Sequence, residues 1–307
     1  MSFYTEEGDR SALQSEIEIN APEGYIGTKM MPVVPVTEKA GSMAYATVTA
    51  ETTAQTSRAA GTAPTATQIS NSAHAWACAE IIERAAITPD EVKQMGGIDK
   101  ADKIGFRWAM RSVLKAREAL IAAVVCGTAD ASFDPAKLRT QTQTALQALR
   151  LYPGKSVLAA GTYTLKAMVQ AIAGDSDAGP AFARIVTGTN AAEAVLGLSI
   201  KAWLQGLALF IGVDEVLAGD DDVWSVAGGT AEKFSIVKVD TTNDPLSHKY
   251  LPILGKCITF LPDGSLGWEL QGVADRTLIN NFYDAKMWID VETYNAAAVY
   301  TFNGVSA

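Results

Sequence analysis

The longest regular pattern of apolar side chains lies in residues 99–126 and has the period of an α-helix. Apolar residues recur there mostly at spacings of three and four, which places them on one helix face. They are Phe106, Ala109, Met110, Val113, Ala116, Leu120, Ala123 and Val124. At about 1.5 Å per residue this helix would be roughly 40 Å long, more than most compact domains need. The spacing therefore predicts one long helix, which we expect to stop at Gly127.

Shorter helices are predicted on both sides of the long one. The sequence at 88–91, Thr-Pro-Asp-Glu, is a capping box with proline at the first helical position, so a short helix should run to about Met95. Gly96 and Gly97 would end it. Further helices are expected at 134–150, at 162–172 and from Asn190 onward.

Strands are predicted mainly in the last part of the chain. Three segments are rich in the β-branched and aromatic residues that favour strands, namely 234–239, 253–260 and 287–294. Two more strands are expected at 157–160 and 207–216, and polar turns at 220–222 and 262–264. This arrangement of helices and strands predicts an α+β fold.

Residues 46–75 can supply very little to a hydrophobic core. Of these 30 residues, 20 are Ala, Thr or Ser, and only Val48 and Ile69 are sizeable aliphatics. Burial of apolar area is what offsets chain entropy, so this segment is either disordered or ordered by something outside its own domain. We interpret it as two weak strands with a bend at Gly61 and Pro64.

The chain before this segment also has extended character. Residues 1–30 are polar without a clear period, which we interpret as an arm. Pro32 and Pro35 bracket Val33 and Val34, and proline disfavours helix for the residue before it. An extended start is therefore predicted at this point.

The charge of the chain argues against tight binding of nucleic acid. The net charge is −9 at pH 7, whereas proteins that grip nucleic acid usually present a basic face. Arg107, Arg111 and Lys115 nevertheless form a basic strip on the side of the long helix opposite its apolar face. The strip is either a solvated face, a subunit contact or a surface near packaged polyanion.

The sequence was compared with common catalytic, cofactor-binding and metal-binding motifs, and none of them predicts a site. Gly154-Lys155-Ser156 resembles the end of a P-loop, but Leu149 stands where the first glycine is needed. The acids at 220–222 are contiguous, which does not fit a calcium loop. Only two histidines are present, and neither has a partner at the spacing of metal ligands. The three cysteines, far apart in the chain, are interpreted as buried free thiols in a reducing compartment.

Four segments, in their order along the chain, resemble the major capsid proteins of tailed bacteriophages, whose fold is shared with herpesvirus shells and encapsulins. Residues 24–45 resemble the passage from N-terminal arm to extended loop, and residues 57–92 resemble the return strand of that loop and the entry to the next helix. Residues 207–224 resemble a strand and turn of the axial domain, and residues 282–302 a common C-terminal ending. The long helix resembles the spine helix of the family.

The resemblance implies a division into four parts. These are an N-terminal arm at 1–31, an extended loop at 32–75, a peripheral domain with the spine helix at 76–133 and 235–284, and an axial domain with a mixed sheet flanked by helices at 134–234 and 285–307. It also implies contacts between subunits, which we assign to Pro32, Val34, Pro35, Arg58, Gly61, Pro64, Arg107 and Arg111.

The function implied by the resemblance is that of a shell subunit without enzymatic activity, cofactor or membrane contact. Copies would form the hexamers and pentamers of an icosahedral or prolate capsid around double-stranded DNA. The partners would be a separate scaffolding protein, a portal and a decoration protein, with assembly of the virion in the host bacterial cytoplasm. The alternatives are an encapsulin-type compartment, an α/β enzyme, and another virion part such as a tail or decoration protein.

Overall fold

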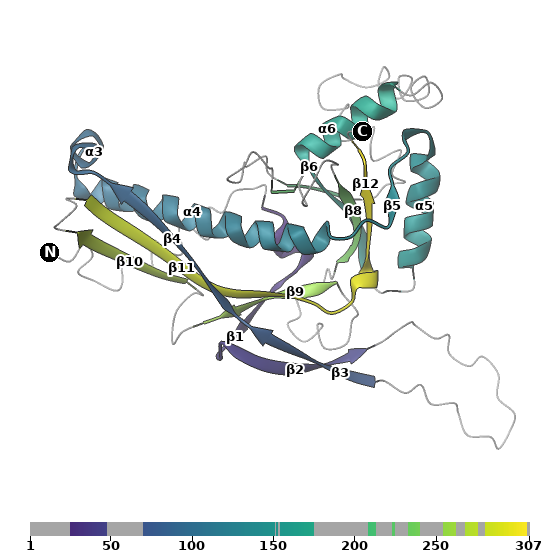
Figure 1. The fold of residues 1–307 in the computed structure, drawn as a ribbon, viewed down its shortest axis with the longest axis horizontal. Coiled ribbons are helices and arrows are strands. Elements are labelled where there is room, and N and C mark those ends of the chain that lie inside the picture. The colour runs from purple at the N-terminus through teal and green to yellow at the C-terminus, as the bar shows by residue number, and fades with distance from the viewer. Residues whose placement is uncertain are drawn as a thin grey trace, which may run out of the picture.

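The computed structural model describes a long helix on one sheet, a second sheet with its own helices, and a projecting pair of strands (Figure 1). The described residues are 25–47, 70–150, 152, 154–174, 208–212, 223–224, 233–239, 254–261, 268–275 and 280–305. Within them no helix is both long and apolar enough to cross a membrane.

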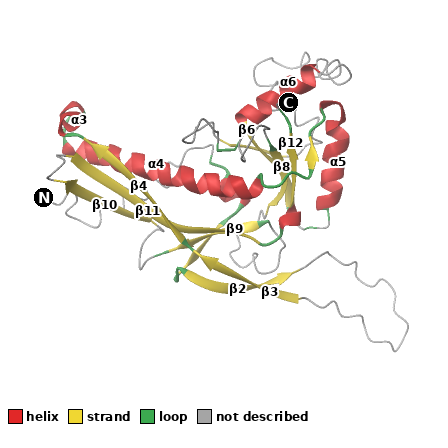
Figure 2. Cartoon of the chain, in the orientation of Figure 1, coloured by secondary structure: helices red, strands yellow, loops and turns green. Residues whose placement is uncertain are grey.

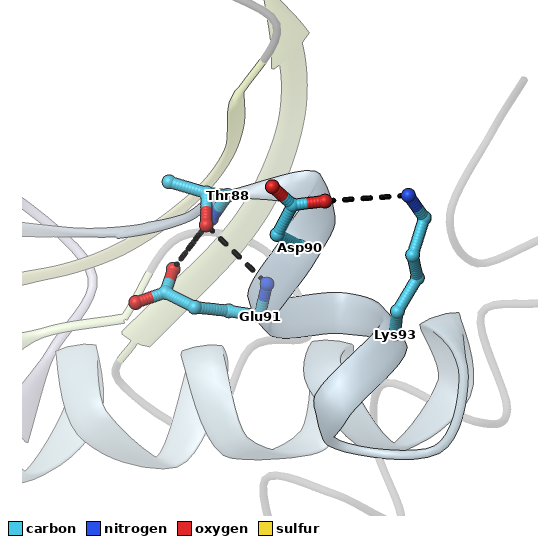
Figure 3. A network of polar contacts seen from close by, with 4 residues as sticks. All are labelled: Thr88, Asp90, Glu91 and Lys93. Carbon is cyan, nitrogen blue, oxygen red and sulfur yellow. Dashed lines mark hydrogen bonds and ion pairs between the residues drawn. The ribbon is translucent and has the colours of Figure 1, made fainter.

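The predicted capping box begins the helical region. Thr88 Oγ1 accepts a hydrogen bond from the backbone N–H of Glu91, whose side chain accepts one from the backbone N–H of Thr88 at 2.7 Å (Figure 3). Helix α3 (Pro89–Gln94) follows. Gly96 and Gly97 then take positive φ angles of 86° and 126°, which turn the chain into α4 (Ile98–Val125). The short helix and the long helix are both confirmed, and α4 ends two residues before Gly127.

The first sheet is built around one long strand, β11 (Asn280–Thr293). Its first half lies between β10 (Trp268–Asp275) and β4 (Ala79–Ile87), both antiparallel to it. Its second half pairs with β9 (Gly255–Phe260), and β1 (Val33–Val36) adds a parallel strand at the end.

Helix α4 covers one face of this sheet. The Tyr283 ring of β11 packs edge-on against Phe106 at 5.1 Å, and its hydroxyl donates a 2.6 Å hydrogen bond to Asp102. Gly105 allows this approach, because a Cβ there would collide with the Tyr283 ring. These three helix residues and the alternating inward side chains of β11 form the core between helix and sheet.

The second sheet is mixed, as the resemblance implied. Its order is β5 (Ala131–Ser132), β12 (Val299–Asn303), β8 (Phe234–Val239), β6 (Lys155–Gly161) and β7 (Ala208–Gly212). Helices α5 (Leu138–Leu149) and α6 (Thr162–Gly174) accompany it (Figure 2). Its own core contains Phe234 stacked on Phe302 at 4.8 Å and edge-on to Phe133 at 5.8 Å.

Several strand predictions differ from the structure in extent. Strand β10 is absent from the predictions, β4 is covered only by the resemblance of residues 57–92 to a return strand, and β11 begins earlier than the predicted segment 287–294. The sequence of β4, Ala-Glu-Ile-Ile-Glu-Arg-Ala-Ala-Ile, has no clean strand period, and it is extended because each of its residues pairs with β11. The helix expected from Asn190 and the turns at 220–222 and 262–264 lie outside the described residues.

The two sheets also group the chain differently from the implied domain ranges at two places. Residues 235–239 of strand β8 belong to the second sheet, and residues 285–293 of β11 belong to the first. The division into domains stays a prediction.

Candidate subunit-contact surfaces

A two-stranded extension projects from the body on one side of the first sheet (Figure 1). Strands β2 (Ala40–Thr47) and β3 (Ser70–Ala77) pair antiparallel from Ala40 opposite Ala77 to Thr47 opposite Ser70. Over their described length these two strands form a sheet of their own. The strand character expected for parts of 46–75 is therefore confirmed at 46–47 and 70–75. Arg58, Gly61 and Pro64 lie outside the described residues.

The base of the extension is fixed to the sheet face that lies away from α4. The backbone N–H of Ala77 donates a 2.7 Å hydrogen bond to Asp290, and the His74 ring lies 5.2 Å from that of Tyr294. The Lys39 ammonium lies 4.7 Å from the centre of the Trp288 ring. Because Asp290 and Trp288 alternate with residues facing α4, the extension and the long helix lie on opposite faces of the first sheet.

Small and exposed side chains cover the base of the extension. Ala73, Ala75 and Ala77 alternate with the half-buried His74 and Trp76 along β3. The Trp76 indole lies over Gly41, its partner on β2, where a Cβ would be 2.5 Å from the ring. An isolated two-stranded ribbon is marginal in water, so a surface of small side chains here suits packing against another molecule.

Strand β1 places the predicted contact residues Val34 and Pro35 at the end of the first sheet, and Pro32 comes immediately before it. It pairs with β9 in parallel, and the Pro32 carbonyl accepts a hydrogen bond from the Cys257 N–H at 3.2 Å. Val34 is half-buried and Pro35 is exposed. Since Pro35 has no N–H, this end strand is a poor template for further strand pairing.

The outer face of α4 carries the predicted basic residues and an unexpected apolar group. Arg107 and Arg111 are exposed, Trp108 between them is 69% exposed, and Ile104 is 43% exposed. The predicted apolar face is correct through Val113 but wrong further on. Leu120 is 45% exposed, and the buried positions shift to Leu114, Glu118, Ile121, Ala122 and Val125.

This shift has a structural cause. The first half of α4 packs on the first sheet, whereas the second half is buried against α2 (Gly27–Met30) and the region of β8. A helix that contacts different layers along its length buries different faces, and a single period cannot describe it.

Sequence reasoning missed Glu118, which links three distant parts of the chain. It lies in α4 with its side chain fully buried, and its Oε1 accepts hydrogen bonds from Ile26 N–H at 2.6 Å, Gly27 N–H at 2.7 Å and Trp224 Nε1 at 2.9 Å. Oε2 has no hydrogen-bond partner among the described residues. Burial raises the pKa of this carboxyl, while the three hydrogen bonds oppose that rise. The only signal for it in the sequence is a carboxylate among the apolar residues of the long helix.

A second buried carboxylate holds the first sheet together. Asp284 on β11 stands opposite Arg84 on β4 and accepts two hydrogen bonds of 2.6 Å from its guanidinium. The Arg84 side chain is half exposed, and the guanidinium also lies 5.2 Å from the Phe282 ring centre. This bidentate pair keeps the carboxylate compensated and fixes the strand register.

The cysteines are free thiols. Cys126 and Cys257 are buried, and burial raises the pKa of each thiol to about 11, so neither is a ready nucleophile at neutral pH. Cys78 is half-buried. No cluster of three or more metal-ligating side chains occurs in the part of the chain that the structure describes.

Comparison with solved structures extends over nearly the whole chain, although no protein-family model and no curated protein matches the sequence. A phage-related protein from Bordetella bronchiseptica RB50 is similar with a TM-score of 0.63 and 16% identity, covering 96% of this chain and 97% of that one. A virus-like particle protein from Pyrococcus furiosus has a TM-score of 0.54 at 11% identity, covering 95% and 96%. The mature capsid of bacteriophage PhiM1 has a TM-score of 0.52 at 10% identity, covering 92% and 87%.

Proposed function

We propose, from the premise that this chain has the fold of phage capsid proteins, that it is a subunit of a closed protein shell. The observation that carries the proposal is the likeness to capsid and particle proteins over almost the full length of both chains. Identity is low throughout, so the likeness concerns the fold, and the activity is argued from the surfaces described above.

The geometry of the extension supports assembly. The two-stranded ribbon projects from one face of the first sheet and, over its described length, makes few contacts with its own subunit beyond its base. It would therefore pack against a neighbouring copy. A contact of this kind joins two different surfaces, and repeated by rotation it closes into rings. The subunit is then stabilised by mass action when its neighbours are present.

In finer detail, we propose a major capsid protein of a tailed phage. Its hexamers and pentamers would form an icosahedral or prolate shell around double-stranded DNA, assembled in the bacterial cytoplasm with a separate scaffolding protein, a portal and a decoration protein. The net charge of −9 supports a wall that encloses DNA without gripping it.

The contact residues are part of the same proposal. Two sets lie on described elements, Pro32, Val34 and Pro35 at β1 and Arg107 and Arg111 on α4. The third set, Arg58, Gly61 and Pro64, is assigned to the segment that joins β2 to β3.

Electron microscopy and light scattering of the purified chain test the proposal. We expect rings, tubes or shells whose amount grows with protein concentration. Particles isolated from producing cells should contain nuclease-protected DNA if the shell is a phage capsid, whereas particles that enclose protein cargo would replace the phage assignment by a compartment shell. A protein that stays monomeric at high concentration would contradict both.

A further inference from the structure

One stripe of α4 is covered at one end and exposed at the other. Steps of three and four residues place Ile104, Arg107, Arg111, Leu114 and Glu118 on the same side of the helix. Leu114 and Glu118 are buried, whereas Ile104, Arg107 and Arg111 are exposed. We call Ile104, Arg107, Trp108 and Arg111 the exposed stripe.

The segment that covers the buried end is the first described part of the chain. Ile26 and Gly27 donate their backbone hydrogen bonds to Glu118, and a Cβ on Gly27 would lie 3.0 Å from the Ile121 side chain. From there α2 leads on to contacts with β8. The described chain therefore begins beside Glu118, about two helical turns from Arg111.

The exposed half of α4 is basic in an acidic protein. Four of its exposed residues are cations and a single exposed residue, Asp99, is an acid. The cations are Lys100, Lys103, Arg107 and Arg111. Among them stands Trp108, whose 69% exposure leaves a large apolar ring at the surface. Such a surface suits a partner that carries both carboxylates and aliphatic side chains.

Residues 1–24 have that chemistry. They contain six carboxylates and one arginine, a net charge of −5, and Glu16 and Glu18 alternate with Ile17 and Ile19. In an extended chain this alternation places acids on one side and isoleucines on the other.

The lengths are compatible with binding in the same subunit. Glu118 is seven residues from Arg111 and fourteen from Ile104, about 10 Å and 21 Å along a helix. Twenty-four residues reach up to about 80 Å when extended. A segment tethered this close to its site has a high effective concentration there.

We propose that the acidic N-terminal segment, residues 1–24, binds along the exposed stripe of α4 in its own subunit. In the free subunit it shields the Trp108 ring and the neighbouring cations from other molecules. This inference concerns the single chain and does not rest on shell formation.

Photo-crosslinking of the full-length chain tests the proposal. A benzophenone side chain replaces Ser112, one helical turn beyond Trp108, and the dilute protein is irradiated, digested and examined by mass spectrometry. We expect the crosslinked partners to come from residues 1–24, with a yield that falls about tenfold in the Arg107→Glu/Arg111→Glu variant. The matched control, Arg139→Glu/Arg150→Glu, reverses two exposed arginines on and after α5 and should leave the yield unchanged.

Two further measurements keep the test decisive. Raising the salt from about 0.05 M to about 0.5 M should lower the yield without any change of the arginines, which decides the matter if the double variant does not fold. A mixture of unlabelled and ¹⁵N-labelled chains should give no mixed crosslinks. Crosslinks outside residues 1–24, a yield insensitive to both charge reversal and salt, or predominantly mixed pairs would overturn the proposal.

Discussion

At the scale of single residues, buried carboxylates connect segments that are far apart in the chain. Glu118 satisfies the backbone N–H groups of Ile26 and Gly27 and the indole N–H of Trp224 with one oxygen. Asp284 is compensated by the bidentate guanidinium of Arg84. Buried charges are tolerated only with such partners, so each of these residues fixes where its partners lie.

The pH dependence of stability should report on Glu118. Burial raises the pKa of Glu118 in the folded protein above its ordinary value of 4.5, so the folded state binds the proton more tightly than the unfolded state. The contribution of this carboxyl to the free energy of unfolding is therefore most favourable at low pH and falls as pH rises through the folded pKa. Glu118→Gln is neutral at every pH. Its free energy of unfolding should therefore approach that of the wild type as pH rises above 4.5.

Urea unfolding of both proteins at several pH values measures this effect. The difference in unfolding free energy should change by about 1.4 kcal/mol for each unit by which the pKa is raised. Glu83→Gln, which removes an exposed carboxylate on β4, serves as the control for the loss of one acidic side chain at the surface. A difference between Glu118→Gln and wild type that is constant with pH would show that the buried carboxyl is not the cause.

At the scale of elements, the extension and α4 lie on opposite faces of the first sheet. The base of the extension is held by contacts from His74 and Ala77 to β11 and the residue after it, and by the 2.7 Å hydrogen bond from Cys78 N–H to the Lys39 carbonyl. We therefore expect the two sheets and their helices to fold without the part of the extension beyond these contacts.

Deletion of residues 46–73 should therefore separate folding from assembly. The base contacts of Ala77 and His74 remain, so the variant should keep the circular dichroism and cooperative unfolding of the wild type. It should not form particles in light scattering, because the surface offered to a neighbour is gone.

A second variant controls for chain length in that experiment. Replacement of residues 48–69 by a glycine–serine segment of equal length keeps the connection but removes its side chains, and it should also fail to assemble. Loss of folding in the deletion variant would mean that the extension belongs to the core of its own subunit. Particle formation by either variant would show that the extension is not needed for assembly.

At the scale of the whole molecule, two separate cores are joined by α4. One core lies between α4, the first sheet and one face of the second sheet, and the other between the opposite face of the second sheet and its helices. The C-terminal end of α4 contacts both layers, since Ser235 Oγ of β8 donates a 2.9 Å hydrogen bond to the Val125 carbonyl. Helix α4 thus couples the positions of the two sheets.

Thermal unfolding should depend on protein concentration if neighbours stabilise the subunit. If only folded copies associate, the midpoint temperature of unfolding rises with total protein concentration, whereas a monomer has a constant midpoint. Calorimetry of the wild type and of the 46–73 deletion over about a hundredfold range of concentration should show a rising midpoint only for the wild type. A constant wild-type midpoint in samples that contain particles would argue that assembly contributes no stability.

The sequence by itself determined the elements whose signals are local. The capping box at Thr88 and Glu91, the two glycines after α3 and the period of the first half of α4 each involve residues within a few positions of one another, and the structure has all of them. The small number of large apolar residues in 46–75 likewise follows from composition, and it indicated that this segment does not belong to the hydrophobic core of its own domain.

Tertiary structure alone decided the features that depend on partners distant in sequence. Strand β4 is extended because β11 pairs with it from Ala79 opposite Ile289 to Ile87 opposite Asn281, about 200 residues later. The buried face of α4 changes along its length because two layers and the Ile26–Gly27 backbone meet it, and Glu118 is buried only because those groups come to it. Local spacing carries no information about which layer a helix will meet, and that encounter also set the position of Ile26 and Gly27.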